Sequence, residues 1–264
     1  MTGIDYARIS KLISEDLRLK TFPVAVKFLE SEKDFPAKTR RPSKALKKRI
    51  TLCQAVTMAR TYGWTVGLTR ADLICVPAMI AFGYSNAPDP GTTLGELFCE
   101  VDFAGGPEKA KEEIDSMSRL ENDQQRAIVM APLFKALFEP DTIAVYGNPA
   151  QIMRMVQAVV YVEGRRLQGN FGGKVECTEY LLAPFLSQSS RVAIPGMGDR
   201  IFSMTQDEEM VLALTPRSLK NLAEGLTKAG KAIGARYPVT FYQNFEPQFP
   251  DHYAKAAEDL GLFE

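Results

Sequence analysis

The chain has 264 residues, 45% of them hydrophobic, and its 32 acidic side chains are balanced by 32 basic ones. A chain of this length buries enough apolar surface to fold without disulfides, as one large domain or as two intimately packed ones. The balanced charge gives no electrostatic reason to expect a nucleic acid or an anionic membrane as the partner.

The N-terminal segment predicts an amphipathic helix with charges of both signs, unlike the long apolar core of a signal peptide. No run of sequence approaches the roughly 20 apolar residues that cross a membrane. We therefore expect a cytoplasmic protein. Thiols stay reduced in that compartment, so its cysteines are expected to be core residues, metal ligands or catalytic groups.

In the first half of the chain, the sequence predicts helices and a strand on either side of a long loop. Residues 4–17 have apolar side chains at helical spacing, and FPVAVKFL (residues 22–29) is typical of a strand. Glycines and prolines from Gly83 to Gly95 predict a loop. The charged stretch from Glu108 to Leu120 predicts a helix.

Between the strand and the loop, a basic stretch leads into a longer helix. Ser43 is the expected N-cap, and the helix is predicted to continue to Gly63. Cys53 falls on the apolar face of this helix. Arg49, one turn earlier, is expected to favour the thiolate form of Cys53.

The second half predicts four strands and two helices. The strands are AIVMAPL (127–133), DTIAVYG (141–147), RVAIP (191–195) and EMVLAL (209–214), and the helices begin at Pro149 and Pro216. The aromatic and proline-rich stretch 237–253 is expected to wrap the surface. These elements do not alternate as regular βαβ units.

We expect an α+β fold, a mixed sheet with packed helices. Each half contains a strand, a helix that ends at a glycine (Gly63 or Gly164) and then a cysteine. This order is compatible with an internal pseudo-duplication. The chain is then a single domain of residues 1–264, or two intimately packed halves of about 18–120 and 125–235 with a C-terminal tail.

Two of the four cysteines, Cys75 and Cys177, lie at matching positions ahead of predicted helix starts. Pro77 suits a first helical turn after Cys75, and Thr178 is a suitable N-cap after Cys177. Free N–H groups at a helix start stabilise a thiolate and donate hydrogen bonds to the sulfur atoms of a cluster. Both thiols are therefore candidates for one site, whereas Cys99 is expected to be a core residue.

Several thiols with only one histidine in the chain indicate soft-ligand chemistry. Structural zinc sites usually contain paired C-x-x-C motifs, which this sequence lacks. The sequence therefore predicts an iron–sulfur cluster held by Cys53, Cys75 and Cys177. A fourth position is left to Cys99, to an oxygen ligand or to a substrate.

Two other kinds of site remain open. The turns YGNPAQ (146–151) and NFGGK (170–174) are candidates for an anion cradle in a metal-free binding or regulatory module, although plain helix capping and a glycine turn also explain them. Cys177 is also a candidate nucleophile of a thiol enzyme. His252, the single histidine, has no hydrolase motif around it.

The segments LCQAVTMAR, IAVYGNPAQIMRMVQA, GGKVEC and IPGMGDRIFSM follow one another in an order that resembles the domain of unknown function 169 family. The resemblance covers most of the chain, from about Phe22 to the helix at Pro216. It implies an uncharacterised prokaryotic protein of a kind common in anaerobes and archaea, with cysteines at positions matching Cys53, Cys75 and Cys177.

The expected function is that of an iron–sulfur protein with one cluster, [4Fe–4S], in a redox, electron-transfer or sensing role. Three thiolates leave one iron open for a fourth protein ligand or a small molecule. A redox partner protein follows from this role, and a homodimer is compatible with the composition. The sequence does not decide whether the protein is an enzyme.

Overall fold

The computed structural model describes residues 3–239 and 251–262. At its centre is a six-stranded sheet with the strand order β2-β3-β1-β4-β6-β5. All pairings between these strands are antiparallel. The strands are β1 (Val24–Leu29), β2 (Val66–Thr69), β3 (Ala127–Pro132), β4 (Thr142–Gly147), β5 (Arg191–Ala193) and β6 (Met210–Leu214).

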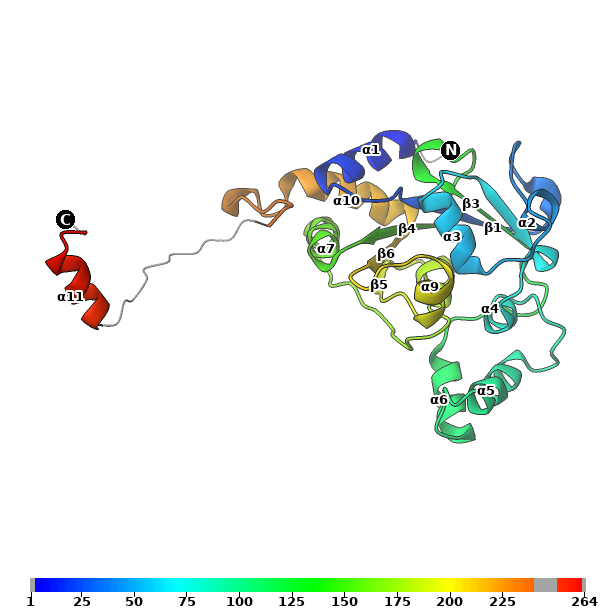
Figure 1. Ribbon diagram of the computed structural model, residues 1–264. Helices are drawn as coiled ribbons and strands as arrows, with labels where there is room; N and C mark the ends of the chain where they lie inside the picture. Colours follow the sequence, from blue (N-terminus) through cyan, green and yellow to red (C-terminus); the bar gives the residue numbers. More distant parts are fainter. Residues whose placement is uncertain (1–2, 240–250, 263–264) are drawn as a thin grey trace.

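Alternation along the central strands gives the sheet two buried faces, because successive side chains of a strand point to opposite sides. Val26 of β1 and Tyr146 of β4 belong to the hydrophobic cluster on one face. Their neighbours Ala25 and Val145 belong to the cluster on the other face. Helices therefore have to cover both sides of the sheet, as Figure 1 shows.

One face is covered by α1 (Tyr6–Asp16), α7 (Pro149–Glu163) and α10 (Pro216–Lys228). The other face carries α3 (Leu52–Arg60), α4 (Val76–Ala81) and a π-helical turn (Thr178–Leu182) that continues into α8 (Ala183–Ser187). The short helix α9 (Met197–Phe202) packs on α3 on this second side. This is the side on which the candidate site lies.

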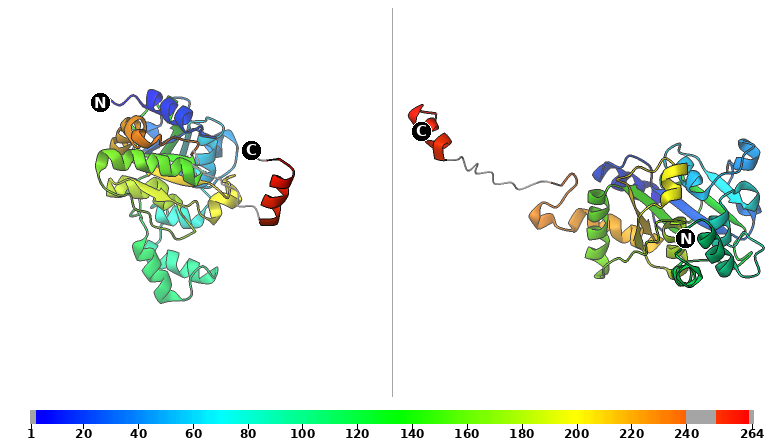
Figure 2. Two further views of the ribbon diagram at one scale, coloured as in Figure 1. Left: turned by 90° about the vertical axis from the view of Figure 1, so that its left-hand side faces the viewer. Right: turned by 60° about the horizontal axis from the view of Figure 1, so that its bottom comes forward.

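The remaining helices lie outside these two layers or at their edge. A pair formed by α5 (Pro90–Glu100) and α6 (Pro107–Ser116) projects from the body of the protein (Figures 1 and 2). The other helices are α2 (Pro42–Ala45) and α11 (Asp251–Asp259). Short 3-10 turns occupy Glu32–Asp34, Arg70–Asp72, Leu133–Lys135 and Lys231–Ile233.

The predicted α+β class is confirmed, and the five predicted strands recur as β1, β3, β4, β5 and β6, whereas β2 and α9 were not predicted. The strands of the two proposed halves interleave, since β1 lies between β3 and β4. The duplication and the division into halves stay predictions. Most of the predicted tail, residues 240–250, lies outside the described residues.

The prediction of one helix from Ser43 to Gly63 was wrong. Ser43 lies inside the short helix α2. Its backbone N–H and its hydroxyl both donate to the buried carboxylate of Asp72. The chain then leaves the helical path, and α3 starts only after Thr51, whose side chain forms a capping box with Gln54. A tertiary hydrogen bond thus outweighs the local helical pattern.

The predicted loop from Gly83 to Gly95 also ends earlier than expected. Asp89 caps α5, because its carboxylate accepts the N–H groups of Gly91 and Thr92. The second half of the expected loop is therefore the first turns of a helix.

The close contact between α7 and α10 depends on a glycine. A Cβ atom at Gly225 would lie 2.0 Å from the carbonyl oxygen of Ala158, so the two backbones meet where a side chain is missing. We expect Gly225→Ala to lower the free energy of unfolding by about 1–3 kcal/mol through overpacking, measured by urea denaturation.

The matched control is Gly95→Ala in α5. There a Cβ would meet Ala110 at 3.6 Å, an ordinary van der Waals distance. Because alanine has the higher helix propensity, this variant is expected to be as stable as the wild type or more stable. Equal effects of the two substitutions would contradict the packing argument.

Candidate functional site

The thiol of Cys75 is an electrostatic neighbour of both Cys53 and Cys177. Cys53 lies in the first turn of α3, Cys75 caps α4, and Cys177 immediately precedes the π-helical turn. Burial is the main cause of the raised pKa of each thiol, and Cys75 raises the pKa of the other two further. Because electrostatic effects weaken with distance, Cys75 lies near enough to act on both of the other thiols.

Backbone pairing brings the first two thiols together. Ile50, just ahead of α3, forms a parallel bridge with Leu73, just ahead of α4. The N–H of Ile74 donates to the carbonyl oxygen of Ile50, which ties the two segments together. Cys53 and Cys75 thus follow two chain segments that run side by side.

The expected thiolate character of these cysteines is not found. The pKa of Cys53 is raised to about 12, mainly by burial and then by the carboxylate of Asp199. Arg49 lies before the start of α3, and its Nε donates to the carbonyl oxygen of Ala71. Burial also raises the pKa of Cys177 well above its usual value. Desolvation therefore outweighs any helix-start effect.

The segment before the π-helical turn differs in detail from the prediction. Cys177 is at the expected place ahead of a helical start, but Thr178 is the first residue of the turn, not its cap. The hydroxyl of Thr178 donates back to the carbonyl oxygen of Val175. This bond closes the loop that delivers Cys177 into the core.

A fourth group, the carboxylate of Asp199, belongs to the same site. It raises the pKa of all three thiols and lies in the first turn of α9. Its two oxygens accept hydrogen bonds from the hydroxyl of Tyr180 and from the N–H of Gly196. The sequence analysis missed Asp199, although an acidic residue directly after the glycine-rich turn PGMG was a usable signal.

A buried aromatic and ionic network lies behind Asp199. The ring of Tyr180 meets that of Tyr146 edge-on, with centroids 6.0 Å apart. The guanidinium of Arg60 lies 4.0 Å from the centroid of Tyr146 and forms two hydrogen bonds, of 2.6 and 3.0 Å, with Glu209. The network fixes the tyrosine hydroxyl that holds Asp199.

The proposed anion cradle at 170–174 is filled by the chain itself. The N–H groups of Gly172 and Gly173 both donate to Oε1 of Glu176. The other carboxylate oxygen, Oε2, is buried without a hydrogen-bond partner among the described residues. Burial raises the pKa of Glu176 to about 7, although the two N–H donors act in the opposite direction.

The turn at 146–151 is likewise satisfied internally. Asn148 and Gln151 form a capping box at the start of α7. The side-chain nitrogen of Asn148 donates to the hydroxyl of Tyr237. The capping interpretation therefore accounts for this segment.

Cys99 lies away from the other thiols, on α5 in the projecting helix pair. It is half-buried and lines a cavity of about 620 Å³ together with Asp89, Lys111 and Arg119. Cys99 is not among the groups that raise the pKa of the other three thiols.

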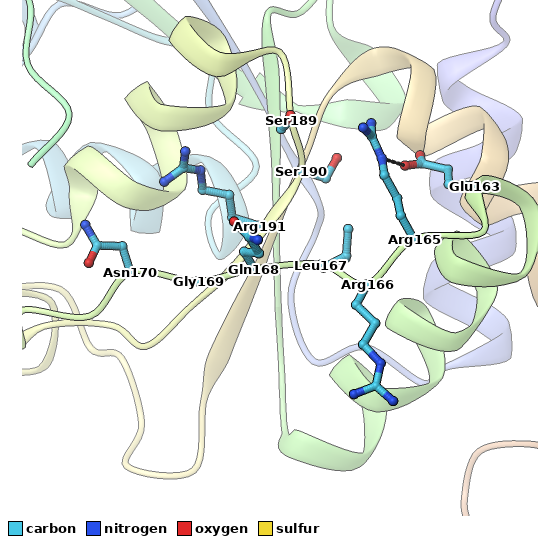
Figure 3. A pocket seen from close by; sticks show the side chains of 10 residues that line it. All are labelled: Glu163, Arg165, Arg166, Leu167, Gln168, Gly169, Asn170, Ser189, Ser190 and Arg191. Carbon is cyan, nitrogen blue, oxygen red and sulfur yellow. Dashed lines mark ion pairs between the residues drawn. The ribbon is translucent and has the colours of Figure 1, made fainter. Parts of the chain in front are cut away.

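Another cavity, of about 270 Å³, is lined by Arg165, Arg166 and Arg191. Figure 3 shows that their side chains diverge and do not point at a common centre. Arg165 pairs with Glu163 and Arg191 with Glu179. Two of the three positive charges are therefore already compensated.

The described residues contain neither a ready-made metal site nor a membrane-spanning helix. Within residues 3–239 and 251–262, no three or more His, Cys, Asp or Glu side chains form a group that could hold a metal ion. In the same ranges, no helix has the length and apolar character that crossing a membrane requires.

The raised pKa of Glu176 predicts a pH-dependent stability. The folded protein keeps this proton between the ordinary pKa of 4.5 and about 7, whereas the unfolded chain loses it. The resulting stabilisation is complete below pH 4.5 and disappears as the pH rises to about 7. Between pH 4.5 and 7 we expect the unfolding free energy of the wild type to fall more than that of Glu176→Gln. The difference between the two falls should reach up to about 3 kcal/mol.

Urea denaturation at a series of pH values measures this difference. Glutamine keeps the acceptor for the two glycine N–H groups, so the comparison isolates the proton. The exposed residue Glu15 supplies the control variant Glu15→Gln, which should follow the wild-type curve. Parallel curves for Glu176→Gln and the wild type would contradict the prediction.

The comparisons with known proteins agree with the resemblance found in the sequence. The model of the DUF169 family, described as "Uncharacterised ArCR", matches residues 12–225. An uncharacterized protein from Methanocaldococcus jannaschii is 28% identical over 219 residues, which cover 82% of this chain and 91% of that relative. No solved structure matches the chain. The chain belongs to the DUF169 family.

Proposed function

We propose that Cys53, Cys75 and Cys177 hold one iron–sulfur cluster, [4Fe–4S], and that the protein has a redox, electron-transfer or sensing role in the cytoplasm. One observation supports this proposal: three thiols from distant parts of the sequence share Asp199 as an electrostatic neighbour, and Cys75 raises the pKa of both Cys53 and Cys177. A redox partner protein, or a small molecule at the cluster, completes the proposed role.

The electrostatics of the site favour a cationic occupant. Burial is the largest cause of the raised pKa of each thiol, and the carboxylate of Asp199 raises all three further. A bound metal reverses this relation, because it stabilises thiolates that burial otherwise disfavours. Thiolates are also the ligands that select iron–sulfur clusters over harder cations.

The spacing expected of a cluster differs from that of a single ion. A zinc ion binds each sulfur at about 2.3 Å, so its ligands crowd together. A cluster places iron and sulfide between its thiolates, which then lie roughly 6–7 Å apart.

The surrounding residues suit a redox centre. Tyr146 and Tyr180 are almost completely buried beside the thiols and keep water away. A cluster would supply one-electron chemistry at this place. The protein would contribute the thiolates, their spacing and a water-poor environment.

The two alternatives have less support. A nucleophilic Cys177 needs a lowered pKa, whereas burial raises the pKa of this thiol. An anion cradle at 170–174 needs free N–H donors, whereas Glu176 already accepts them.

Cluster reconstitution under anaerobic conditions tests the proposal. We expect the wild type to take up about four iron and four sulfide per chain and to show a broad visible absorbance that bleaches on reduction. Cys53→Ser, Cys75→Ser and Cys177→Ser should each lose most of the bound iron, because an alcohol is a poor ligand for a cluster. Iron and sulfide analysis and absorbance spectra measure both effects.

Cys99→Ser is the matched control, since it removes a thiol that lies outside the site. It is expected to bind as much iron as the wild type. A colourless wild type after reconstitution would refute the proposed function, and equal losses in all four variants would refute the assigned ligands.

A further inference from the structure

The C-terminal helix α11 carries an exposed apolar stripe. Tyr253 and Ala256, with Leu260 directly after the helix, recur at helical spacing and therefore share one side. Tyr253 is 62% exposed and Leu260 is 71% exposed. Figures 1 and 2 show α11 apart from the body of the protein. We propose that α11 binds reversibly in the groove between α1 and α10 of its own chain.

The way in which α11 ends shows that the sequence specifies a helix here. Gly261 adopts a φ of +59°. Its N–H donates to the carbonyl oxygen of Glu258, and the N–H of Leu262 donates to that of Ala257, which together form a Schellman motif. A helix of nine residues is only marginally stable alone in water and gains most of its stability from packing an apolar face. This helix therefore needs a surface to bind.

The groove between α1 and α10 offers such a surface. It has a volume of about 620 Å³, and its lining includes Ile4, Leu12 and Ala223, which are only half-buried. Ile4 and Ala223 pack against the hydrophobic cluster on this face of the sheet. The apolar stripe of α11, placed in the groove, would extend this cluster outward and remove apolar surface from water.

The charges of the groove and of the helix are complementary. Arg8 and Lys220 line the groove, are exposed, and form no ion pair within residues 3–239 and 251–262. The groove carboxylates are already engaged, since Asp5 caps α1 and Glu15 lies 3.8 Å from Nζ of Lys11. In α11, acidic side chains outnumber basic ones: Asp251, Glu258 and Asp259 against Lys255.

The cavity beside Cys99 has the same volume of about 620 Å³ but the wrong charge for this helix. Carboxylates outnumber cations in its lining: Asp89, Glu96, Glu100 and Asp115 against Lys111 and Arg119. An acidic helix is repelled there, whereas the two unpaired cations between α1 and α10 attract it.

The chain between α10 and α11 is long enough for this contact. Residues 234–250 join the turn Lys231–Ile233 to α11. Fully extended, at roughly 3.3 Å per residue, they span up to about 55 Å. The 13 residues of α10 extend over only about 20 Å. Because a tethered helix has an effective concentration in the millimolar range, a weak contact is sufficient.

Amine-specific cross-linking of the wild type tests the position of α11. Lys255 should react with Lys11 and Lys220 of the groove at least about tenfold more than with Lys109 of α6, which is also exposed. Peptide mass spectrometry measures the yields. A mixture of ¹⁴N- and ¹⁵N-labelled chains distinguishes cross-links within one chain from those between two copies.

Cross-links within one chain support the proposal. Products of mixed isotope composition would place α11 in the groove of a second copy and overturn its assignment to its own chain. Equal yields at the groove lysines and at Lys109 would overturn the groove as the binding site.

Hydrogen exchange of the α11 amides measures the stability of the contact. Tyr253→Ser should lower their protection at least about tenfold, because it removes the largest side chain of the stripe. Ala254→Ser is the matched control, since Ala254 is exposed beside the stripe and serine there lowers the helix propensity at least as much. Equal protection in these two variants, or an unprotected α11 in the wild type, would overturn the proposal.

Charge reversal tests the electrostatic part. Arg8→Glu should lower the protection of α11 about threefold, because it replaces an attractive charge in the groove by a repulsive one. Lys109→Glu changes the net charge of the protein by the same amount outside the groove and should leave the protection unchanged. Equal effects of the two reversals would contradict a contact through Arg8.

Discussion

The shared burial of four acidic groups is the constraint on which the site depends. Cys53, Cys75, Cys177 and Asp199 come from separate elements; burial raises the pKa of each, and Asp199 raises the pKa of all three thiols further. Such a cluster is costly if its members ionise without a cation. Tyr180 and the N–H of Gly196 donate to Asp199, whereas the thiols of Cys53 and Cys177 donate to the carbonyl oxygens of Gly198 and Val175.

Two regions of the fold provide that support. On one side, the bridge between Ile50 and Leu73 sets the starts of α3 and α4 against each other. On the other, the ion pair of Arg60 and Glu209 spans α3 and the segment before β6, with Tyr146 of the central strand β4 packed on the guanidinium. Removing one partner of such a buried pair leaves an uncompensated charge, at a cost of about 3–5 kcal/mol. The site is thus tied to the most deeply buried part of the sheet.

Local patterns predicted the elements well and the long-range contacts poorly. The strands β1, β3, β4, β5 and β6 and the helices that begin at Pro149 and Pro216 were found from the sequence, and so was the position of Cys75 ahead of a helix. The strand β2 and the helix α9 were not. The start of α3 was missed because Ser43 bonds to Asp72, 29 residues away in sequence. Asp199 was missed for the same reason, since its role depends on Tyr180 and on three thiols that only the folded chain brings near it.

The glycine segment 170–174 acquires a structural role from these contacts. Its N–H donors bind Glu176, and the carbonyl oxygen of Gly173 accepts the N–H of Met197 at the start of α9. One short loop therefore holds both the residue before Cys177 and the helix that carries Asp199. A Cβ atom at Gly196 would lie 3.1 Å from the carbonyl oxygen of Gly173, so the missing side chain at Gly196 permits this close contact. The backbone of Gly172 and Gly173 thus contacts both Glu176 and the start of α9. The carboxylate of Glu176 occupies the N–H donors that an external anion would need.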